Sequence, residues 1–244
     1  MKIFYYDIAI NLPLRQCFTY KSNIDIKNGM RVVVPFGKKN IIGIVIKKQI
    51  NLNIDKDLKE IKSVVDEYTC FDKSIFKTIL WASDYYHHPI GEVFFSFIPT
   101  MLRKNNNKTI SKSDTNIEYK INKDDKNLKL TPEQKNNLQN LNKIKSFSPS
   151  LIYGVTGSGK TEIYLQLAEK FLKKNKSVLI LVPEINLIPQ LVNRFKNRFL
   201  GEIGVYHSRK TSNKRLDIWL KSKFGKLKIV IGKEFSFSFS IKII

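Results

Sequence analysis

Apolar residues in the first 65 positions occur in short runs separated by turn residues. The runs are 3–10, 18–20, 30–36, 41–46 and 61–65, and pairs such as Asn28-Gly29 and Gly37-Lys38 lie between them. Short apolar runs bounded by glycine and asparagine are typical of strands joined by tight turns. Strands at this regular spacing predict a small barrel-like β domain.

The apolar period changes from strand-like to helical at residue 72. The apolar side of the expected helix over 72–87 comprises Ile75, Ile79, Leu80 and Trp81. We expect Pro89 and Gly91 to end this helix, because both residues disfavour a continuing helix. The aromatic residues that follow, Phe94, Phe95 and Phe97, are interpreted as core.

The last hundred residues alternate between strand-like and helix-like patterns. The expected strands are 150–153, 177–182, 203–206 and 228–231. The expected helices carry the apolar stripes Ile163, Leu167, Ala168, Phe171 and Leu172, then Leu191, Val192, Phe195 and Phe199, then Leu216, Trp219 and Leu220, the last closed by Gly225. This order predicts an α/β fold with a parallel sheet, the run 177–182 as a central strand, right-handed crossovers and a ligand at the carboxyl ends of the strands.

A polar segment separates the two patterns. Residues 103–129 are rich in Asn, Lys, Asp and Ser and read as a linker. Thr131 then supplies an N-cap, Pro132 a first helical turn and Glu133 an acid near the helix dipole. We therefore expect a β-rich domain over 1–102, a linker over 103–129 and an α/β lobe over 130–244.

The residues Gly154, Val155, Thr156, Gly157, Ser158, Gly159, Lys160 and Thr161 match the phosphate-loop pattern G-x-x-x-x-G-K-[ST] without deviation. In such a loop the backbone N–H groups surround phosphate oxygens, Lys160 reaches the outer phosphates and the Thr161 hydroxyl is a ligand of Mg²⁺. The helix that starts here adds its positive dipole end. The expected strand before the loop and helix after it support ATP binding, with Lys160 and Thr161 as the catalytic candidates; a glycine-rich surface turn is the alternative.

The charge of the chain supports a polyanionic partner without proving one. The formal net charge is +22, but lysine greatly outnumbers arginine, which an AT-rich genome can produce by itself. No apolar run reaches the roughly 18 to 20 residues of a membrane helix, and an acid at Asp7 argues against a signal peptide. Cys17 and Cys70 have no metal-ligand spacing and read as reduced thiols. We expect a cytoplasmic protein without a membrane partner.

Several longer runs together resemble the family of bacterial primosomal replication-restart helicases, the primosomal protein N′ (PriA) family. They are VPFGKKNIIGIVI at 34–46, WASDYYHHPIGEVFFSFIP at 81–99, LTPEQ at 130–134, GVTGSGKTEIYL at 154–165, LVPEINLIPQ at 181–190, and the spaced residues His207, Ser208, Arg215 and Trp219. The resemblance implies the first RecA-like lobe of a superfamily 2 helicase, with ATP and Mg²⁺ as cofactors.

The resemblance also implies that the N-terminal domain holds the 3′ end of a nascent strand at a stalled fork. The positions that match the family pocket are Phe18, Thr19, Gly37, Lys38 and Lys62. A phenyl ring offers a stacking face, lysines offer charge to phosphate, and a glycine lets the backbone approach closely. Thr19 stands where many relatives have Asp. On residue type alone, Phe18 as barrel core and the lysines as solvated surface remain open.

The resemblance also implies roles for positions in the second half of the chain. Gln134 resembles the glutamine that reads adenine, although a plain helix-surface glutamine explains its local sequence equally well. The segment 183–190 resembles the motif that couples the nucleotide site to the DNA strand, or is an ordinary turn from strand to helix. His87 and His88 suggest an aromatic corner more than a metal site, because adjacent residues on a helix point about 100° apart.

Two departures from the family pattern limit the expected activity. The winged-helix domain that usually lies before the helicase core looks deleted at 103–129, and the sequence after Gly232 lacks the family's D-E-x-H acids, its arginine fingers and its zinc-binding cysteines. The tail 233–244 also looks like an aggregation-prone edge. We therefore expect a truncated helicase or the product of a degenerating gene, able to bind ATP but scarcely to hydrolyse it or unwind DNA.

Two functions of different class follow. The first is an ATP-dependent 3′-5′ DNA helicase of replication restart, with forked and single-stranded DNA, primosome proteins and single-stranded-DNA-binding proteins as partners. The second is a non-enzymatic protein that binds DNA 3′ ends. A small-molecule kinase is a remote third, because the chain shows no substrate lid.

Overall fold

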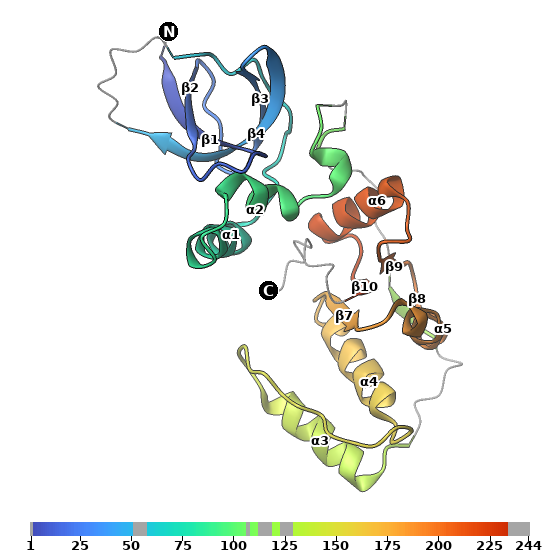
Figure 1. The fold of residues 1–244 in the computed structure, drawn as a ribbon. Coiled ribbons are helices and arrows are strands. Elements are labelled where there is room, and N and C mark those ends of the chain that lie inside the picture. The colour runs from blue at the N-terminus through green and yellow to red at the C-terminus, as the bar shows by residue number, and fades with distance from the viewer. Residues whose placement is uncertain (1, 51–57, 106–107, 112–118, 123–128, 234–244) are drawn as a thin grey trace. The chain divides into compact units, whose positions relative to one another are not determined.

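The computed structural model describes residues 2–50, 58–105, 108–111, 119–122 and 129–233. These residues form two compact units, each coloured by residue number in Figure 1. The first unit contains the described residues up to 111 together with 208–224, and the second contains 119–207 and 225–233. Each unit is described by itself below.

The first unit is built from five strands, three α-helices and a 3-10 helix. Their bounds are β1 Phe4–Ile10, β2 Phe18–Ser22, β3 Arg31–Phe36, β4 Lys39–Gln49, β5 Ser63–Val64, α1 Lys73–Tyr85, α2 Ile90–Ser96, η1 Thr100–Leu102 and α6 Ser212–Lys223. The strands form one sheet in the order β2-β1-β4-β3-β5, and the named pairings are antiparallel.

This sheet closes on itself. The backbone of Lys21 in β2 donates to the carbonyl of Lys59 at 3.0 Å and accepts from the N–H of Ile61 at 2.9 Å, so the chain entering β5 pairs with the opposite edge strand. Alternate residues Tyr6, Ile8 and Ile10 of β1 point into the shared interior, as the two-residue period of a strand requires. The predicted barrel-like domain is confirmed.

A buried ion pair covers the outer face of β3. The guanidinium of Arg31, which is fully buried, donates to both carboxylate oxygens of Asp66 at 2.8 and 2.6 Å. It also donates to the carbonyls of Leu102 and Lys108, and Asp66 accepts from the N–H of Ile110. These contacts tie the chain after the barrel to the barrel wall. The sequence pattern did not indicate this role for either charged residue.

The helices after the barrel depart from two predictions. Trp81 was predicted on the apolar side of α1, but its side chain is 55% exposed. Gly91 was predicted to end that helix, but it lies inside α2, where a Cβ would come within 1.7 Å of the carbonyl oxygen of Ile10. Glycine is needed there because helix and strand meet backbone to backbone. The prediction that Phe94 and Phe95 belong to the core is confirmed.

Helix α6 belongs to the first unit. Its Trp219 is 1% exposed, and the amino group of Lys223 donates to the carbonyl of Cys70 at 3.1 Å. Phe224 packs edge-on against Tyr68. Burial lowers the pKa of Lys223 and raises the pKa of the Cys70 thiol, because it disfavours the charged form of each group.

The second unit contains a three-stranded parallel sheet, a two-stranded sheet and three α-helices. The bounds are β6 Lys120–Ile121, α3 Pro132–Lys143, α4 Lys160–Lys173, β7 Val178–Val182, η2 Ile185–Leu187, α5 Ile188–Arg198, β8 Phe199–Leu200, β9 Ile203–Tyr206 and β10 Ile229–Lys233. The parallel order is β7-β10-β9. The predicted parallel sheet is confirmed, although β10 and not the run 177–182 is its central strand.

Residues 150–153, predicted as a buried strand, form no strand. Leu151 and Tyr153 are 90% and 91% exposed. A strand needs a partner in register, and three apolar residues in a row cannot specify that partner. The phosphate loop is therefore preceded by a segment without regular secondary structure, which pairs with none of the strands the structure describes.

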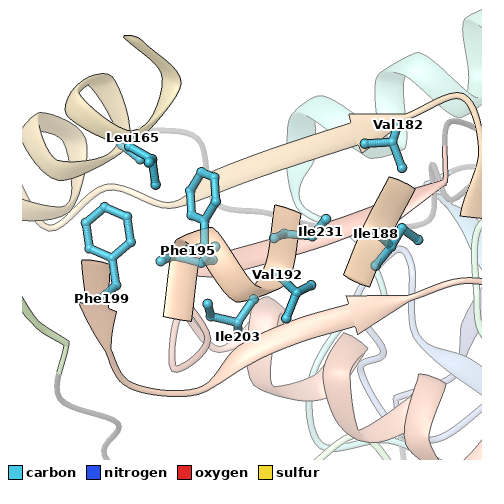
Figure 2. Packing of buried hydrophobic residues seen from close by; sticks show 10 residues of the cluster. Leu165, Val182, Ile188, Val192, Phe195, Phe199, Ile203 and Ile231 are labelled. Atoms are coloured by element: carbon cyan, nitrogen blue, oxygen red, sulfur yellow. The ribbon is translucent and has the colours of Figure 1, made fainter. Parts of the chain in front are cut away.

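The core of the second unit lies between the helices and the parallel sheet (Figure 2). Leu165 of α4, Phe195 of α5, Ile203 of β9 and Ile231 of β10 all belong to it, and Phe195 is fully buried. Phe199, predicted on a helix, begins strand β8 and packs against Phe195 with ring centroids 5.7 Å apart. Of the stripe predicted on α4, Ala168 and Leu172 face the core as expected, but Phe171 is exposed and the core residue Leu165 was not predicted. The stripe predicted on α5 faces the core, apart from the boundary at Phe199.

Parts of the predicted linker belong to the folded units. Ile110 is fully buried in the first unit, and β6 pairs antiparallel with β8 in the second. Tyr119 and Ile121 pack against the core of the second unit. Residues 106–107, 112–118 and 123–128 of the predicted linker and the predicted aggregation-prone tail, apart from Lys233, lie outside the described residues.

Candidate nucleotide-binding and DNA-binding sites

The phosphate loop is folded at the start of α4. Gly159 is the N-cap residue in the left-handed conformation, with φ of 78°, and a Cβ there would lie 2.4 Å from the Gln134 amide nitrogen. At Gly154 a Cβ would lie 2.7 Å from the Ser158 hydroxyl. Glycine is required at 159 by its left-handed backbone, whereas at 154 the contact is with the end of a side chain that can rotate away. The loop between them exposes Val155, Thr156, Gly157 and Ser158, so its backbone is accessible to a ligand.

Lys160 lies across its own loop. Its amino group donates to the carbonyls of Gly154 at 2.6 Å and Val155 at 2.9 Å. An ammonium has three N–H donors, so one is left after these two bonds. Thr161 follows in the first turn of α4 and is half-buried. The loop geometry, the helix N-terminus and the lysine are the features of an anion-binding loop.

Gln134 links α3 to the phosphate loop. Its side-chain oxygen accepts from the N–H of Thr131 at 2.9 Å, and the Thr131 hydroxyl accepts from the N–H of Gln134, which completes a capping box. Its amide nitrogen donates to the carbonyl of Ser158 at 2.7 Å. The sequence suggested either an adenine contact or a helix-surface residue, whereas the structure gives the side chain a contact with the loop itself.

A buried ion pair joins the phosphate-loop helix to α5. The Glu162 carboxylate accepts from the Arg198 guanidinium at 3.2 Å, and both side chains are almost fully buried. Glu162 follows Thr161 directly, and Arg198 ends the helix that begins within the segment 183–190. The pair therefore joins the helix that follows the phosphate loop to the helix that begins in the segment 183–190, which resembles the family motif that couples nucleotide to DNA.

In the first unit, Phe18 meets the turn between β3 and β4. Its ring packs edge-on against Phe36 with centroids 5.2 Å apart, and it is half-buried against the barrel core. Gly37 follows Phe36 with φ of 57°, and an ideal Cβ there would meet nothing within 4 Å. The barrel therefore offers a partly exposed ring beside an open turn. Both expected roles of Phe18, core and stacking face, fit this position.

Thr19 lies on the opposite face of β2 from Phe18 and has a carboxylate beside it. Its hydroxyl donates to Asp7 Oδ1 at 2.9 Å across the β1–β2 pairing. The second Asp7 oxygen accepts a short hydrogen bond from the Gln49 amide. Burial raises the pKa of the Cys17 thiol to about 11, and the Asp7 charge adds to the shift. Neither Asp7 nor Gln49 was a candidate from the sequence pattern.

Lys38 and Lys62 are both exposed. Lys62 is anchored through its backbone N–H, which donates to the carbonyl of Val33 at 2.8 Å, so its side chain projects from the barrel wall. The structure thus brings Phe18 together with the Gly37 turn through Phe36, and Thr19 together with Asp7. It places the two lysines on the same barrel, and neither side chain has a hydrogen bond or an ion pair among the described contacts.

Three exposed aromatic rings at the end of α1 were missed as a possible binding surface. Trp81 stacks on Tyr85 with centroids 5.0 Å apart, and Tyr86 packs edge-on against Tyr85 at the same distance. Their side chains are 55%, 63% and 69% exposed. Lys73 and Lys77 precede Trp81 at four-residue intervals and are exposed. Exposed rings beside lysines are the composition of a single-stranded nucleic-acid surface.

The neighbouring histidines make no metal site with the described residues, in which no group of three or more potential His, Cys, Asp or Glu ligands occurs. His88 Nε2 lies 3.0 Å from the Glu92 carboxylate, four residues later on α2. His87 has φ of 50° at the turn that follows α1. Within the same described ranges, no helix is both long and apolar enough to cross a membrane.

Comparison with known proteins assigns both units. Residues 7–99 match the family model of the PriA 3′ DNA-binding domain, and residues 127–238 match the model of the type III restriction enzyme res subunit. The two matches cover the barrel with its two following helices and the phosphate-loop unit, in that order. The chain belongs to the PriA family.

Individual relatives extend over both matched regions. The replication restart protein PriA of Haemophilus influenzae is 31% identical across 92% of this chain, and that of Borreliella burgdorferi is 32% identical across 94%. PriA of Bacillus subtilis is 51% identical over a shorter stretch of 82 residues. The chain spans 41% of the Haemophilus protein and 35% of the Borreliella protein.

Proposed function

We propose that this chain binds the 3′ end of a DNA strand through its first unit and ATP with Mg²⁺ through its second, and that it acts in replication restart as part of a 3′-5′ DNA helicase. The observation that carries the proposal is the pair of family matches, one on each unit and in the order found in PriA relatives. We place this action in the cytoplasm, with primosome and single-stranded-DNA-binding proteins as further partners.

In the proposed nucleotide site, backbone N–H groups of residues 154–159 bind phosphate oxygens. Lys160 exchanges its bonds to the Gly154 and Val155 carbonyls for bonds to the outer phosphates. Gln134 keeps one N–H and one lone pair beyond its present bonds, which matches the edge of an adenine. The Thr161 hydroxyl holds the magnesium ion, which neutralises phosphate charge when bound.

In the proposed DNA site, the terminal base stacks on the half-exposed ring of Phe18. The open turn at Gly37 admits the sugar-phosphate backbone, and Lys38 and Lys62 supply positive charge to the phosphates. Thr19 contacts the terminal nucleotide directly. The high net charge of +22 favours this polyanionic ligand, and binding should weaken as salt rises.

A second candidate function is 3′-end binding without ATP turnover. The exposure of Leu151 and Tyr153 favours it, since the strand expected to support the phosphate loop is unpaired among the described residues. Two measurements on the purified chain separate the candidates: ATPase rate with and without forked DNA, and affinity for a 3′-ended oligonucleotide.

The helicase proposal predicts ATP binding with weak, DNA-stimulated hydrolysis that Lys160→Ala abolishes, while 3′-end affinity stays unchanged. Absence of ATP binding by the unaltered chain would contradict the nucleotide site. Equal affinity for free and blocked 3′ ends would contradict the DNA site. ATP binding without turnover, together with tight 3′-end binding, would favour the second candidate.

A further inference from the structure

The carboxylate of Asp7 has a defined partner on each oxygen. Oδ1 accepts from the Thr19 hydroxyl at 2.9 Å, and Oδ2 accepts from the side-chain amide of Gln49. The three residues come from adjacent strands β2, β1 and β4, whose pairing fixes their spacing. Asp7 and Thr19 are directly opposite in the register and both half-buried, so the pair is held rigidly yet is reachable from solvent.

The hydrogen bond determines what Thr19 can offer to a ligand. A hydroxyl has one hydrogen to donate and two lone pairs that accept. Because Asp7 takes the hydrogen, Thr19 faces a ligand as an acceptor only. A bond to a carboxylate also polarises the hydroxyl and increases the negative charge on its oxygen. The pair therefore presents at position 19 the same hydrogen-bonding character as a carboxylate.

We propose that Asp7 is a positioning residue of the 3′-end pocket, which fixes the Thr19 hydroxyl as the acceptor for an N–H or O–H donor of the terminal nucleotide. The inference rests on the proposed function and deepens it. It accounts for a carboxylate beside a surface proposed to bind phosphates: Asp7 repels phosphate but orders a group that recognises a donor. The donor is either the 3′-hydroxyl or an N–H on the edge of the terminal base.

Substitution of Asp7 by asparagine should change the hydrogen-bonding character of Thr19. Gln49 already donates to one oxygen of residue 7, so the asparagine oxygen satisfies Gln49 and its NH₂ group turns toward Thr19. The Thr19 oxygen then accepts from that NH₂, and its hydrogen is free to point at the ligand. The Thr19 oxygen keeps one lone pair but loses the polarising carboxylate, so the pocket has a weaker acceptor and a competing donor, although the side chain at position 7 keeps its shape.

The test is fluorescence anisotropy of the full chain with labelled single-stranded oligonucleotides of one sequence. One ends in an ordinary adenine nucleotide with its 3′-hydroxyl, one in the same nucleotide without the 3′-hydroxyl, and one in an unsubstituted purine nucleotide, whose ring can still stack on Phe18 but whose edge carries no N–H donor. A donor on the sugar is lost only in the second, and a donor on the base only in the third. The measured quantity is the end preference, the ratio of the affinity for the ordinary end to that for the weaker modified end.

For the unaltered chain we expect an end preference of about tenfold, which corresponds to about 1.4 kcal/mol. Thr19→Val should reduce it to about onefold, because it removes the acceptor, and Asp7→Asn should lower it to an intermediate value, because it weakens the acceptor without removing it. Thr19→Asp alone places two carboxylates side by side and should also bind poorly. The double variant Asp7→Asn with Thr19→Asp restores a carboxylate beside an amide donor and should regain the preference.

Asp25→Asn is the matched control. Asp25 is an exposed carboxylate of the same unit that also accepts from a hydroxyl, that of Tyr6 at 3.1 Å, and it carries the same charge change. It should leave the end preference unchanged, and thermal unfolding of every variant reports whether the barrel is intact.

A folded Asp7→Asn variant that keeps the full preference while Thr19→Val loses it would overturn the role of Asp7 alone. Failure of the double variant to recover would do the same. An unaltered chain without any end preference would overturn the proposed 3′-end pocket and this inference with it.

Discussion

The barrel sheet and the parallel sheet of this chain differ in how the backbone groups of their edge strands are hydrogen-bonded. In the first unit, β1–β2 and β3–β4 pair as neighbours in sequence, β1–β4 and β3–β5 join more distant segments, and the two edges meet through the backbone of Lys21. In the second unit, the edge strands β7 and β9 each have one paired side among the described strands, and the segment before the phosphate loop has none. The barrel thus closes its edges and contains two local antiparallel pairs, whereas both pairings of the parallel sheet join strands that are not neighbours along the chain or are separated by a helix.

This difference bears on the two proposed sites. Phe18, Thr19 and Gly37 lie on or between paired barrel strands, so their spacing is fixed by hydrogen-bonded ladders. The phosphate loop is held at one end by α4 and by the Gln134 contact, and at its other end by exposed backbone. We infer that the DNA site is the more rigid of the two, and four predictions can break or sharpen this comparison.

The largest expected effect is a loss of unfolding free energy in the first unit alone. Arg31→Met leaves Asp66 buried without its counter-charge, and removing one partner of a buried pair costs about 3–5 kcal/mol. Chemical denaturation with probes in each unit should show an earlier transition for the first unit and an unchanged one for the second. Lys48→Met, which breaks the exposed pair with Asp25, is the control and should cost less than about 1 kcal/mol. A common shift of both transitions would mean that the units fold as one.

The corresponding change in the second unit is Glu162→Gln. It removes the charge opposite Arg198 but keeps the side chain's shape, and Glu169 remains 4.0 Å from the same guanidinium. We therefore expect a smaller loss, about 2 kcal/mol, confined to the transition of the second unit. Hydrogen exchange of α4 and α5 should rise together. If only α4 exchanged faster, the pair would not couple the two helices.

The third prediction compares exposed aromatic residues in the two units. Trp81→Ala removes the indole ring that stacks on Tyr85, and loss of one stacking surface costs about 1–3 kcal/mol of single-stranded DNA affinity. Phe147, 96% exposed and in no ring pair among the described residues, is the matched control. Phe147→Ala should leave the affinity unchanged in the same titration. Equal effects of both substitutions would show that the cluster is no specific DNA surface.

The smallest effect concerns Cys17. Its pKa of about 11 lies above the ordinary value of 9.0, since burial and then Asp7 disfavour the thiolate. Reaction with a thiol reagent should therefore be slow at neutral pH and accelerate only as pH rises toward 11. Any stability that the neutral thiol contributes is fully present below pH 9 and is lost as the pH rises from about 9 to about 11. Asp7→Asn should speed the reaction at each pH, and an unchanged rate would place Asp7 too far away to matter.

The sequence predicted the barrel because short apolar runs such as 30–36 and 41–46 are regularly spaced and separated by turn residues. It predicted the phosphate loop and its helix because the pattern there depends on local backbone geometry. It failed at 150–153, where an apolar run alone does not reveal whether a partner strand exists. It also misjudged Trp81, because a helical period identifies a face but not whether another element covers it.

Contacts between distant residues were beyond sequence reasoning. The pairs Arg31–Asp66 and Asp7–Thr19 join residues separated by 35 and 12 positions, and nothing in their local sequence marks them as partners. Charged residues are usually exposed, so a fully buried arginine is the least expected assignment for position 31. Register between strands had to be known before either pair could be proposed.

Gly91 carries a consequence for anyone who alters this chain. A methyl group at that position would occupy the space of the Ile10 carbonyl, so helix α2 would have to withdraw from β1 by roughly the width of an atom. Phe94 and Phe95 sit on the same helix and are buried beneath it. A change of one hydrogen to a methyl group would thus expose two phenyl rings, and the clearest symptom would be loss of solubility before any loss of binding.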